Sequence, residues 1–353
     1  MTAPPIDFDG LKIDALLIAS LPNVRYVTGF TGSNAVVLAA PGRLTLFTDP
    51  RYTIQAEQEA GRRADIRIVK GMLTEAVVQA IRRKGIKRLG FEKAHISYQI
   101  WHGLRESVPL GVSLRPLSGV VEELRMMKNA AEIELIRRAV DTNSRAFAAA
   151  VKKIRPRMRE MDLAAELEYQ MRRYGAEKAS FETIVASGAR TALPHAQPGA
   201  QRFGERDMVL VDMGATVNGY TSDMTRMVFL GDPDAKTRKM YKAVLNAQLA
   251  GTAAVRAGVA AHQVDRATRR VLKAEGLDKD FVHSTGHGLG LEIHEAPRLG
   301  KKDATPLRAG MVVTIEPGVY KKGQGGIRIE DTVLVTEKGR EVLTPTSKEL
   351  TVL

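Results

Sequence analysis

Two aspartates interrupt an otherwise apolar hairpin in the C-terminal half of the chain, and no other feature restricts the fold as strongly. The stretch DMVLVDMGATVNGYTSDMTRMVFLG (207–231) has apolar runs on both sides of the Asn-Gly pair at 218–219, which is a strong signal for a two-residue β-turn. A turn at that pair sets Asp212 opposite Thr225 and brings Asp223 onto the same face of the ribbon as Asp212. Because carboxylates on one face repel each other unless positive charge lies between them, we expect a binding site here and not two solvated aspartates.

A second pair of carboxylates follows the same pattern further along the chain. MVVTIEPGVY (311–320) and GGIRIEDTVLVT (325–336) each resemble an apolar strand, and each carries one interrupting glutamate, Glu316 or Glu330. Arg328 is two residues from Glu330, so these two side chains point to the same side of the strand. Taken alone, Arg328 and Glu330 fit a structural ion pair equally well.

Three of the seven histidines lie in the stretch FVHSTGHGLGLEIHEAP (281–297), interleaved with glycines. Glycine permits tight turns and a close approach of the backbone to a ligand. Histidine supplies a metal ligand or a proton shuttle near neutral pH. The stretch therefore predicts an active-site loop that holds His283, His287 and His294.

The four carboxylates and one neutral imidazole make an oxygen-rich set of donors with four negative charges. A single divalent cation leaves that charge under-compensated, whereas two cations bridged by carboxylates balance it. Two such ions roughly 3.5–4 Å apart make a hydrolytic centre in which a metal-bridging hydroxide attacks the substrate. Oxygen-dominated ligation favours Mn²⁺ or Mg²⁺, and the imidazole also admits Co²⁺ or Zn²⁺. We therefore predict two divalent metal ions as cofactors, with Mn²⁺ preferred.

The composition excludes several classes of protein. The chain has no cysteine, which rules out disulfides, thiolate metal sites and a cysteine nucleophile. No apolar run approaches the roughly 20 residues that span a bilayer, and the start MTAPPIDFDG lacks a secretory signal, so we expect a cytoplasmic protein without a membrane partner. The net charge of +13 would suit nucleic acid. The basic residues are dispersed, however, and aromatic residues make up only 5% of the chain, so solvated basic faces are the preferred interpretation.

The length of 353 residues and a change of pattern near residues 118–128 predict two domains. The first part alternates short apolar runs with helical segments, which is typical of an α/β domain. Its expected strands are 14–20, 35–40, 44–49, 88–92 and 113–117, and its expected helices are 51–60 and 72–85. The second part begins with a long amphipathic helix at 128–155, where Asn129 and Glu132 fit a capping box. Further helices are expected at 161–175, 240–258 and 262–276.

The order Asp…Asp…His…Glu…Glu resembles that of the pita-bread metallopeptidases, and here their proline-specific branch, the Xaa-Pro aminopeptidases and Xaa-Pro dipeptidases. The matching motifs are VDMGATVNGYTSDMTR, HSTGHGLGLEIHE, TIEPGVY and GIRIEDTVLV, within residues 180–336. The resemblance implies an α+β pita-bread catalytic domain, which we place at 123–353. It also implies five metal ligands, which are Asp212, Asp223, His287, Glu316 and Glu330.

The same resemblance implies roles for further polar residues. His195, in the segment ALPHAQP, matches the histidine that assists proton transfer at the scissile amide. His294 matches the one that binds the substrate carbonyl, and His283 lines the substrate pocket. Arg328 is typical of the proline-specific branch and is expected among the catalytic and substrate-binding residues. Glu316 is expected to act as general base, because metals and burial can tune the pKa of a carboxylate to take a proton from water.

One position departs from the pattern of the family. Relatives often have a glycine where Ser284 stands, in the motif HGTGHG. A serine is tolerated there if its backbone does not need a positive φ, so the departure concerns the geometry of the loop and not the ligands.

The N-terminal part resembles the domain shared by aminopeptidase P, prolidase and creatinase. The segments that carry this resemblance are PNVRYVTGFTGSNAVVL (22–38) and LFTDPRYTIQA (46–56). It implies a creatinase/prolidase-type α/β domain at 1–122, with roles in substrate access and dimerisation, and hence a homodimer. Creatinase has the fold without the metal ligands, so the complete ligand set here argues against it.

Hydrolysis of an Xaa-Pro bond is the function that remains. The FTGS and FTDPRY segments favour an Xaa-Pro aminopeptidase of the aminopeptidase P type, acting on peptides with proline at the second position. An Xaa-Pro dipeptidase, or prolidase, is the alternative. Cations near the proline carboxylate, or a loop that blocks the site beyond proline, would decide between the two. A catalytically inactive relative that binds nucleic acid or protein is a remote alternative, because such relatives typically lose metal ligands.

Overall fold

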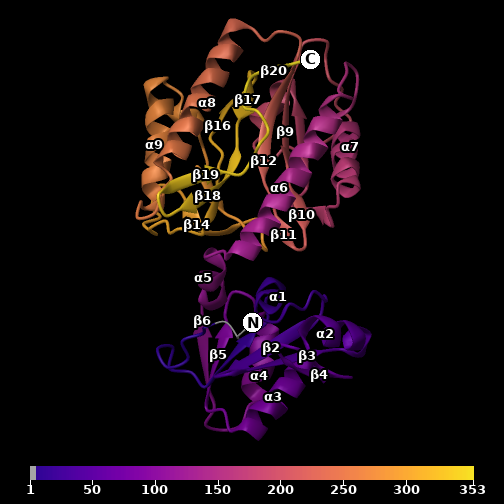
Figure 1. Ribbon diagram of the computed structural model, residues 1–353, viewed down its shortest axis with the longest axis vertical. Coiled ribbons are helices and arrows are strands. Elements are labelled where there is room, and N and C mark those ends of the chain that lie inside the picture. Colours follow the sequence, from indigo (N-terminus) through magenta and orange to yellow (C-terminus); the bar gives the residue numbers. More distant parts are fainter. Residues whose placement is uncertain (1–4) are drawn as a thin grey trace. The chain divides into compact units, whose positions relative to one another are not determined.

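The computed structural model describes residues 5–353, and the chain divides into two compact units, Met1–Arg125 and Met126–Leu353, coloured from indigo to yellow along the sequence in Figure 1. We call them the N-terminal unit and the C-terminal unit. Residues 1–4 lie outside the described residues. They are part of the predicted N-terminal domain at 1–122 and of the segment MTAPPIDFDG, for which no secretory signal is predicted.

A six-stranded sheet with helices on both faces forms the N-terminal unit. In sheet order, its strands are β4 (Asp65–Ile68), β3 (Arg43–Thr48), β2 (Ala35–Ala40), β1 (Ala15–Ile18), β5 (Arg88–Glu92) and β6 (Ser113–Leu117). Its helices are α1 (Leu21–Thr28), η1 (Pro50–Tyr52), α2 (Thr53–Ala60), α3 (Leu73–Lys84), α4 (Tyr98–Ser107) and α5 (Val120–Met126).

Alternation along β1 explains how both faces of this sheet are covered. Leu16 and Ile18 lie in a core with residues of α1 and α2, while Ala15 and Leu17 lie in a second core with residues of α3 and α4. β1 runs parallel to β5 and antiparallel to β2. The predicted α/β class of the N-terminal part is confirmed.

The C-terminal unit begins with the long helix that the sequence predicts. In α6 (Ala130–Val151) the Asn129 side chain accepts hydrogen bonds from the backbone of Ala131 and Glu132, and the Glu132 side chain accepts one from the Asn129 backbone. This reciprocal pair is the predicted capping box. The other helices of the unit are α7 (Glu160–Arg173), η2 (Gly188–Ala192), α8 (Ala235–Ala254), α9 (Ala261–Ala274) and η3 (Asp278–Asp280).

A four-stranded sheet lies between two layers of helix in this unit (Figure 1). In sheet order, its strands are β20 (Thr351–Val352), β12 (Met224–Leu230), β9 (Asp207–Met213) and β8 (Ile184–Ser187). Val209 and Val211 of β9 pack in a core with α6 and α7. Leu210, on the opposite face of β9, packs in a core with α8 and α9.

The hairpin between β9 and β12 has the register that the Asn-Gly pair predicts. Thr225 is paired with Asp212. Asn218 and Gly219 both have positive φ, 48° and 77°, as a two-residue hairpin turn with the right-handed strand twist requires. Near the turn the ribbon continues as β10 (Ala215–Val217) and β11 (Tyr220–Thr221), which form a three-stranded sheet with β7 (Lys178–Ala179).

The predicted continuous strands at 311–320 and 325–336 are wrong, because each breaks at its glutamate. The first splits into β15 (Val312–Ile315) and β16 (Gly318–Lys321), and the second into β17 (Gly325–Arg328) and β18 (Asp331–Thr336). β15 pairs with β18 in one sheet and β16 pairs with β17 in another. A physical reason is Pro317, whose nitrogen cannot donate to the ladder.

The register of the two halves is nevertheless continuous. Ile315 is paired with Asp331, and Gly318 is paired with Arg328. Counting inward from both pairs sets Glu316 opposite Glu330 at the corner between the sheets. β15 and β18 belong to a five-stranded sheet with β13 (Gly286–Gly288), β14 (Glu295–Leu299) and β19 (Gly339–Val342). The unit thus combines packed helices with sheets that are antiparallel except for the pair β12–β20, and the predicted α+β class is confirmed.

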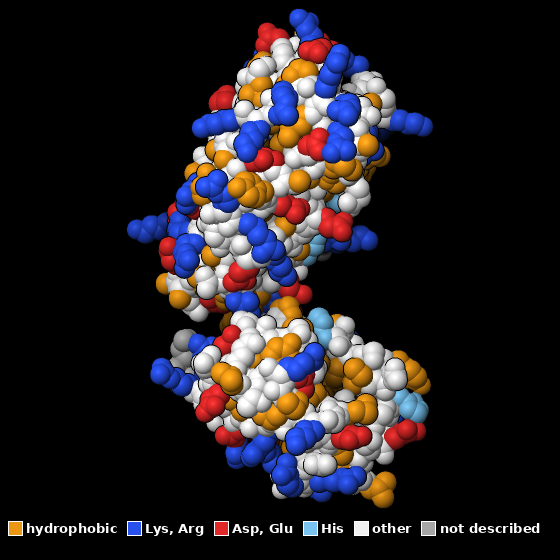
Figure 2. Space-filling model, turned by 90° about the vertical axis from the view of Figure 1, so that its right-hand side faces the viewer, with side chains coloured by type: hydrophobic (Ala, Val, Ile, Leu, Met, Phe, Trp, Pro, Cys, Tyr) orange, Lys and Arg blue, Asp and Glu red, His pale blue; other side chains and the backbone are white. Residues whose placement is uncertain are grey.

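The surface shows mixed charge. In Figure 2, Lys and Arg side chains are scattered over the visible face among Asp and Glu side chains and apolar ones. Within residues 5–353, no helix has both the length and the hydropathy that a membrane crossing needs.

Candidate metal centre

One cavity of the C-terminal unit gathers every site residue that the sequence predicts. Its volume is about 650 Å³. The hairpin β9–β12, the loop and strand around β13, and the corner between β15, β16, β17 and β18 all contribute to its wall. The predicted residues that line it are Asp212, Asp223, His287, Glu316, Glu330, His195, His283, His294 and Arg328.

The donor atoms lie close enough to share metal ions. Asp223, His287 and Glu330 each offer a ligand atom, and these atoms lie within 4.8 Å of one another. His287 Nε2 is 3.6 Å from Asp223 Oδ2 and 3.5 Å from Glu316 Oε1. The other ring nitrogen, Nδ1, lies 3.0 Å from the Gly288 carbonyl oxygen. When Nδ1–H donates to that carbonyl, the Nε2 lone pair faces the carboxylates, as a metal ligand requires.

Positive charge would stabilise this cluster of buried carboxylates. Burial, together with repulsion from Glu330 and Asp212, raises the pKa of Asp223 well above its usual value. Burial and repulsion from Glu316 and Asp212 do the same for the pKa of Glu330. Burial raises the pKa of Glu316 to about 8, although the Arg328 cation opposes it. Positive charge beside Asp223, Glu316 and Glu330 would therefore favour their ionised forms.

Two further observations fit a metal at this place. Within residues 5–353, Asp212 Oδ1 and Glu330 Oε1 are buried oxygen atoms without a hydrogen-bond partner, and such atoms are costly unless a ligand satisfies them. Burial lowers the pKa of His287 to about 4, so its imidazole is neutral and able to coordinate. The residues present therefore fit divalent cations.

Arg328 contacts one of the predicted ligands directly and reaches a second one through Thr225. Its guanidinium donates to Asp212 Oδ2 at 2.7 Å and to the Thr225 hydroxyl at 3.1 Å. Thr225 in turn donates to Glu330 Oε2 at 2.7 Å. The remaining nitrogen, Nη1, donates to the Tyr320 hydroxyl at 2.7 Å and the Pro194 carbonyl at 3.1 Å. The catalytic and substrate-binding roles predicted for Arg328 stay predictions beside this observed contact with Asp212.

The three other histidines occupy different environments. His283 is partly buried, with Nδ1 2.8 Å from the Ser284 carbonyl oxygen and Nε2 2.9 Å from the Tyr320 hydroxyl. Burial lowers the pKa of His283 to about 4, so the imidazole is neutral at pH 7. His195 and His294 are exposed and line the cavity, and the His294 ring meets the His287 ring with 4.4 Å between their centroids.

The glycines of the histidine-rich stretch serve the packing of strands and not only the approach to a ligand. A Cβ on Gly286 would lie 1.9 Å from the Thr314 carbonyl oxygen, and one on Gly288 would lie 2.2 Å from the Ala296 carbonyl oxygen. Both contacts are impossible, so glycine is required for β13 to lie against its neighbours. Ser284 has no positive φ, which confirms that a serine is tolerated there.

Sequence reasoning missed two residues of the site. The Tyr320 hydroxyl contacts both His283 and Arg328. Burial raises the pKa of Tyr320 to about 12, although the Arg328 cation opposes this shift. Arg298 lines the cavity, and its Nε lies 3.3 Å from the Ser284 hydroxyl. The sequence signal that could have identified Arg298 is its position four residues after His294. Within residues 5–353, no carboxylate lies within 4.0 Å of the Arg298 guanidinium.

The comparisons with known proteins agree with this geometry. Residues 134–337 match metallopeptidase family M24, and residues 8–127 match the creatinase/prolidase N-terminal domain. The Xaa-Pro dipeptidase of Pyrococcus furiosus is 37% identical over 97% of this chain and 96% of its own length.

Solved structures resemble both units together. The Xaa-Pro dipeptidase from Bacillus anthracis has a TM-score of 0.95 and 40% identity, covering 98% of this chain and 97% of that one. The X-Pro aminopeptidase from Thermotoga maritima has a TM-score of 0.91 and 36% identity, covering 98% and 99%.

Proposed function

The chain belongs to metallopeptidase family M24, in its proline-specific pita-bread branch, and on that premise we propose that it is an Xaa-Pro dipeptidase. The observation that carries the proposal is Arg298, a cation in the wall of the catalytic cavity. The sequence alone favoured the aminopeptidase P type, with the dipeptidase as its alternative. The position of Arg298 turns our preference to that alternative.

A dipeptide differs from a longer peptide in carrying a free carboxylate on its proline. Arginine binds carboxylates through two parallel hydrogen bonds. The Arg298 guanidinium lines the cavity, and the Asp303 carboxylate accepts from the Arg298 backbone amide, at 2.9 Å, rather than from the guanidinium. The relatives from P. furiosus and B. anthracis, both Xaa-Pro dipeptidases, support this reading.

The five predicted ligands would hold the metal ions. Asp212, Asp223, His287, Glu316 and Glu330 all line the cavity, and Mn²⁺ is our preferred metal because oxygen donors dominate. When bound, divalent cations supply an acidified water and polarise the scissile carbonyl.

The chain's own residues handle the protons and the substrate. Glu316 takes a proton from the attacking water, since it lines the cavity with Oε1 3.5 Å from His287 Nε2. His283 lies beside Glu316, with Nδ1 4.0 Å from Glu316 Oε2, and its Nε2 lies 2.9 Å from the Tyr320 hydroxyl. His195 donates a proton to the leaving proline nitrogen, and His294 donates to the carbonyl oxygen.

A matched set of substrates tests the proposal. We expect the Mn²⁺-loaded protein to hydrolyse Ala-Pro with a higher kcat/KM than Ala-Pro-Ala or Ala-Pro-amide. Arg298→Gln should raise KM for Ala-Pro by about 10- to 100-fold, the range for a hydrogen bond to a charged group. The same substitution should leave KM for Ala-Pro-amide unchanged, because that substrate has no carboxylate.

The second candidate is an Xaa-Pro aminopeptidase, favoured by the structural similarity to the T. maritima enzyme. A higher kcat/KM for Ala-Pro-Ala, with no effect of Arg298→Gln on either substrate, would establish this candidate instead. The homodimer, the cytoplasmic location and the access role of the domain at 1–122 stay predictions.

A further inference from the structure

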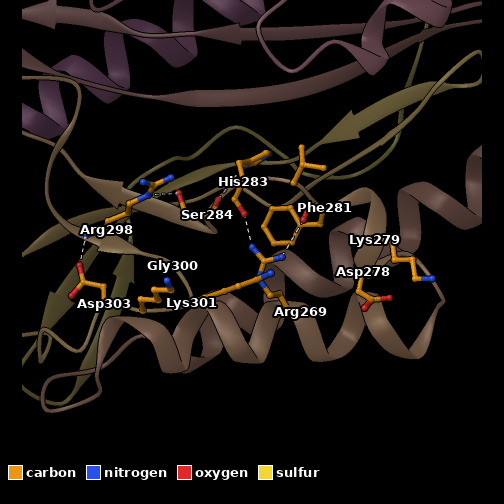
Figure 3. A pocket seen from close by; sticks show the side chains of 12 residues that line it. Arg269, Asp278, Lys279, Phe281, His283, Ser284, Arg298, Gly300, Lys301 and Asp303 are labelled. Carbon is orange, nitrogen blue, oxygen red and sulfur yellow. Dashed lines mark hydrogen bonds between the residues drawn. The ribbon is translucent and has the colours of Figure 1, made fainter.

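Helix α9 carries two residues, one turn apart, that bind the segment leading to the ligand His287. Arg269 forms an ion pair with Asp265, with Nε 2.8 Å from Oδ2. Its two terminal nitrogens donate to backbone carbonyls, Nη1 to Phe281 at 3.1 Å and Nη2 to His283. Figure 3 shows the Arg269 side chain rising from the helix to both residues.

Asp265 binds the other end of the same segment. Its side chain is buried, and Oδ1 accepts hydrogen bonds from the Thr285 hydroxyl at 2.9 Å and from the Thr285 amide at 3.3 Å. The Thr285 carbonyl in turn accepts from the Glu316 amide at 2.7 Å. Through one threonine, Asp265 is therefore linked to the backbone of the proposed general base.

The segment 281–285 depends on these side chains, because it lies outside the strands. A backbone carbonyl without a strand partner must find its donor elsewhere, and Arg269 supplies donors to the carbonyls of Phe281 and His283. The Arg269 guanidinium also lies 4.2 Å from the centre of the Phe281 ring, which meets the His283 ring edge-on at 5.0 Å. Both the backbone and the ring of His283 are thus fixed from α9.

Neither α9 residue faces the substrate. In the described part of the chain, the wall of the catalytic cavity includes neither Asp265 nor Arg269. Arg269 lines a separate cavity of about 890 Å³, which shares His283, Ser284 and Arg298 with the catalytic one (Figure 3). Any effect of these residues on catalysis must therefore pass through the segment they hold.

We propose that Arg269 and Asp265 are positioning residues of the metal centre, which set the segment 281–285 and through it His283, His287 and Glu316. The proposal rests on the function proposed for the site. It assigns to the pair a purpose beyond stability, because the contacts converge on groups that handle the metal and the proton.

Arg269→Gln is the first test, with Arg270→Gln as a matched control on an exposed position of the same helix. We expect Arg269→Gln to lower kcat for Ala-Pro and to weaken Mn²⁺ binding, measured by calorimetric titration, each by about 10- to 100-fold, as for other outer partners of metal ligands. The KM should change less than kcat, since the substrate contacts stay in place. Arg270→Gln should match the wild type in all three.

Two substitutions of Thr285 separate positioning from packing and serve if Arg269→Gln fails to fold. Thr285→Ser keeps the hydroxyl and should keep kcat and Mn²⁺ affinity near wild type. Thr285→Val keeps the shape without the hydroxyl and should lose both. Equal losses in the two variants, or wild-type values in Arg269→Gln and Thr285→Val, would overturn the proposal. A wild type that cleaves no Xaa-Pro peptide would refute the proposed function, while Mn²⁺ affinity would still test the positioning role.

Discussion

Among single residues, Asp223 has the sharpest expected phenotype. Asn at this position keeps the shape but removes the charge that balances a divalent cation. Asp223→Asn should therefore lose at least one Mn²⁺ per chain and reduce hydrolysis of Ala-Pro by more than about 100-fold, consistent with the metal's part in catalysis. The metal-free variant should be no less stable than metal-free wild type, because one of the mutually repelling buried carboxylates is gone.

Metal analysis and urea unfolding check this prediction. Asp232→Asn is a suitable control, since Asp232 is exposed and pairs only with the surface residue Arg238 among the described residues. An Asp223→Asn protein with the full metal content and activity would refute the ligand assignment.

His283 predicts a dependence of stability on pH. Burial lowers its folded-state pKa to about 4, below the usual value near 6.5. As pH falls, the unfolded chain takes up the proton first, so the contribution of His283 is complete above about pH 6.5 and is lost as pH falls towards 4. The loss amounts to about 3 kcal/mol at most.

The measurement is the free energy of unfolding of metal-free protein at pH 7 and pH 4.5. We expect the difference between the two pH values to be smaller in His283→Gln than in wild type. His102→Gln, at an exposed position of α4, should leave the difference unchanged. An unchanged difference in His283→Gln would mean that the imidazole is protonated equally in both states.

The sequence singles out candidate metal ligands more readily than the residues that contact them. A carboxylate inside an apolar strand is a conflict that needs a reason, so Asp212 and Glu330 are visible without a structure. Arg298 and Arg269 are two among 53 Lys and Arg residues, and their residue type says nothing about which carbonyl or carboxylate they meet. Their roles depend on contacts across the fold, as between Arg269 and His283.

At the level of elements, local turns were predictable and changes of sheet were not. The Asn-Gly turn fixes the register of β9 and β12 because it determines the pairing of its neighbours directly. The breaks at Glu316 and Glu330 follow from which strand pairs with which, and the apolar pattern runs through both breaks. Pro317 is the local signal, and a single proline does not state that the strand resumes in a second sheet.

The position of Gly286 in β13 should not tolerate a larger residue. A Cβ there would lie 1.9 Å from the Thr314 carbonyl oxygen, which belongs to the backbone of β15, so β13 and the proposed ligand His287 must shift. Gly286→Ala should destabilise the protein by about 1–3 kcal/mol, the usual range for overpacking, and should weaken Mn²⁺ binding.

Thermal unfolding with and without Mn²⁺ measures both the stability and the strength of Mn²⁺ binding. Gly103→Ala makes the same substitution in α4, where nothing lies within 4 Å of the added Cβ, and it should stabilise the helix by up to about 1 kcal/mol. Gly286→Ala with wild-type stability and Mn²⁺ affinity would show that the strands can separate without cost.

At the level of the whole molecule, the chain has separate cores. Val121 of α5 packs in a core of the N-terminal unit, and Met126 at the end of the same helix packs in a core of the C-terminal unit. All predicted metal ligands belong to the C-terminal unit. Since a ligand stabilises only the folded structure that binds it, metal should protect the two units unequally.

Hydrogen exchange of the full-length chain, with Mn²⁺ and after chelation, measures this inequality. At a metal concentration 1,000 times Kd, binding contributes about 4 kcal/mol, so amides in 207–231 and 311–336 should exchange up to about 1,000-fold faster once the metal is removed. Amides of β1 and β5 should keep their rates, because their cores contain no ligand. In Asp223→Asn the effect of chelation should shrink in the C-terminal unit. Equal acceleration in both units would show instead that the chain opens as one cooperative block, whose N-terminal unit takes its stability from the metal centre.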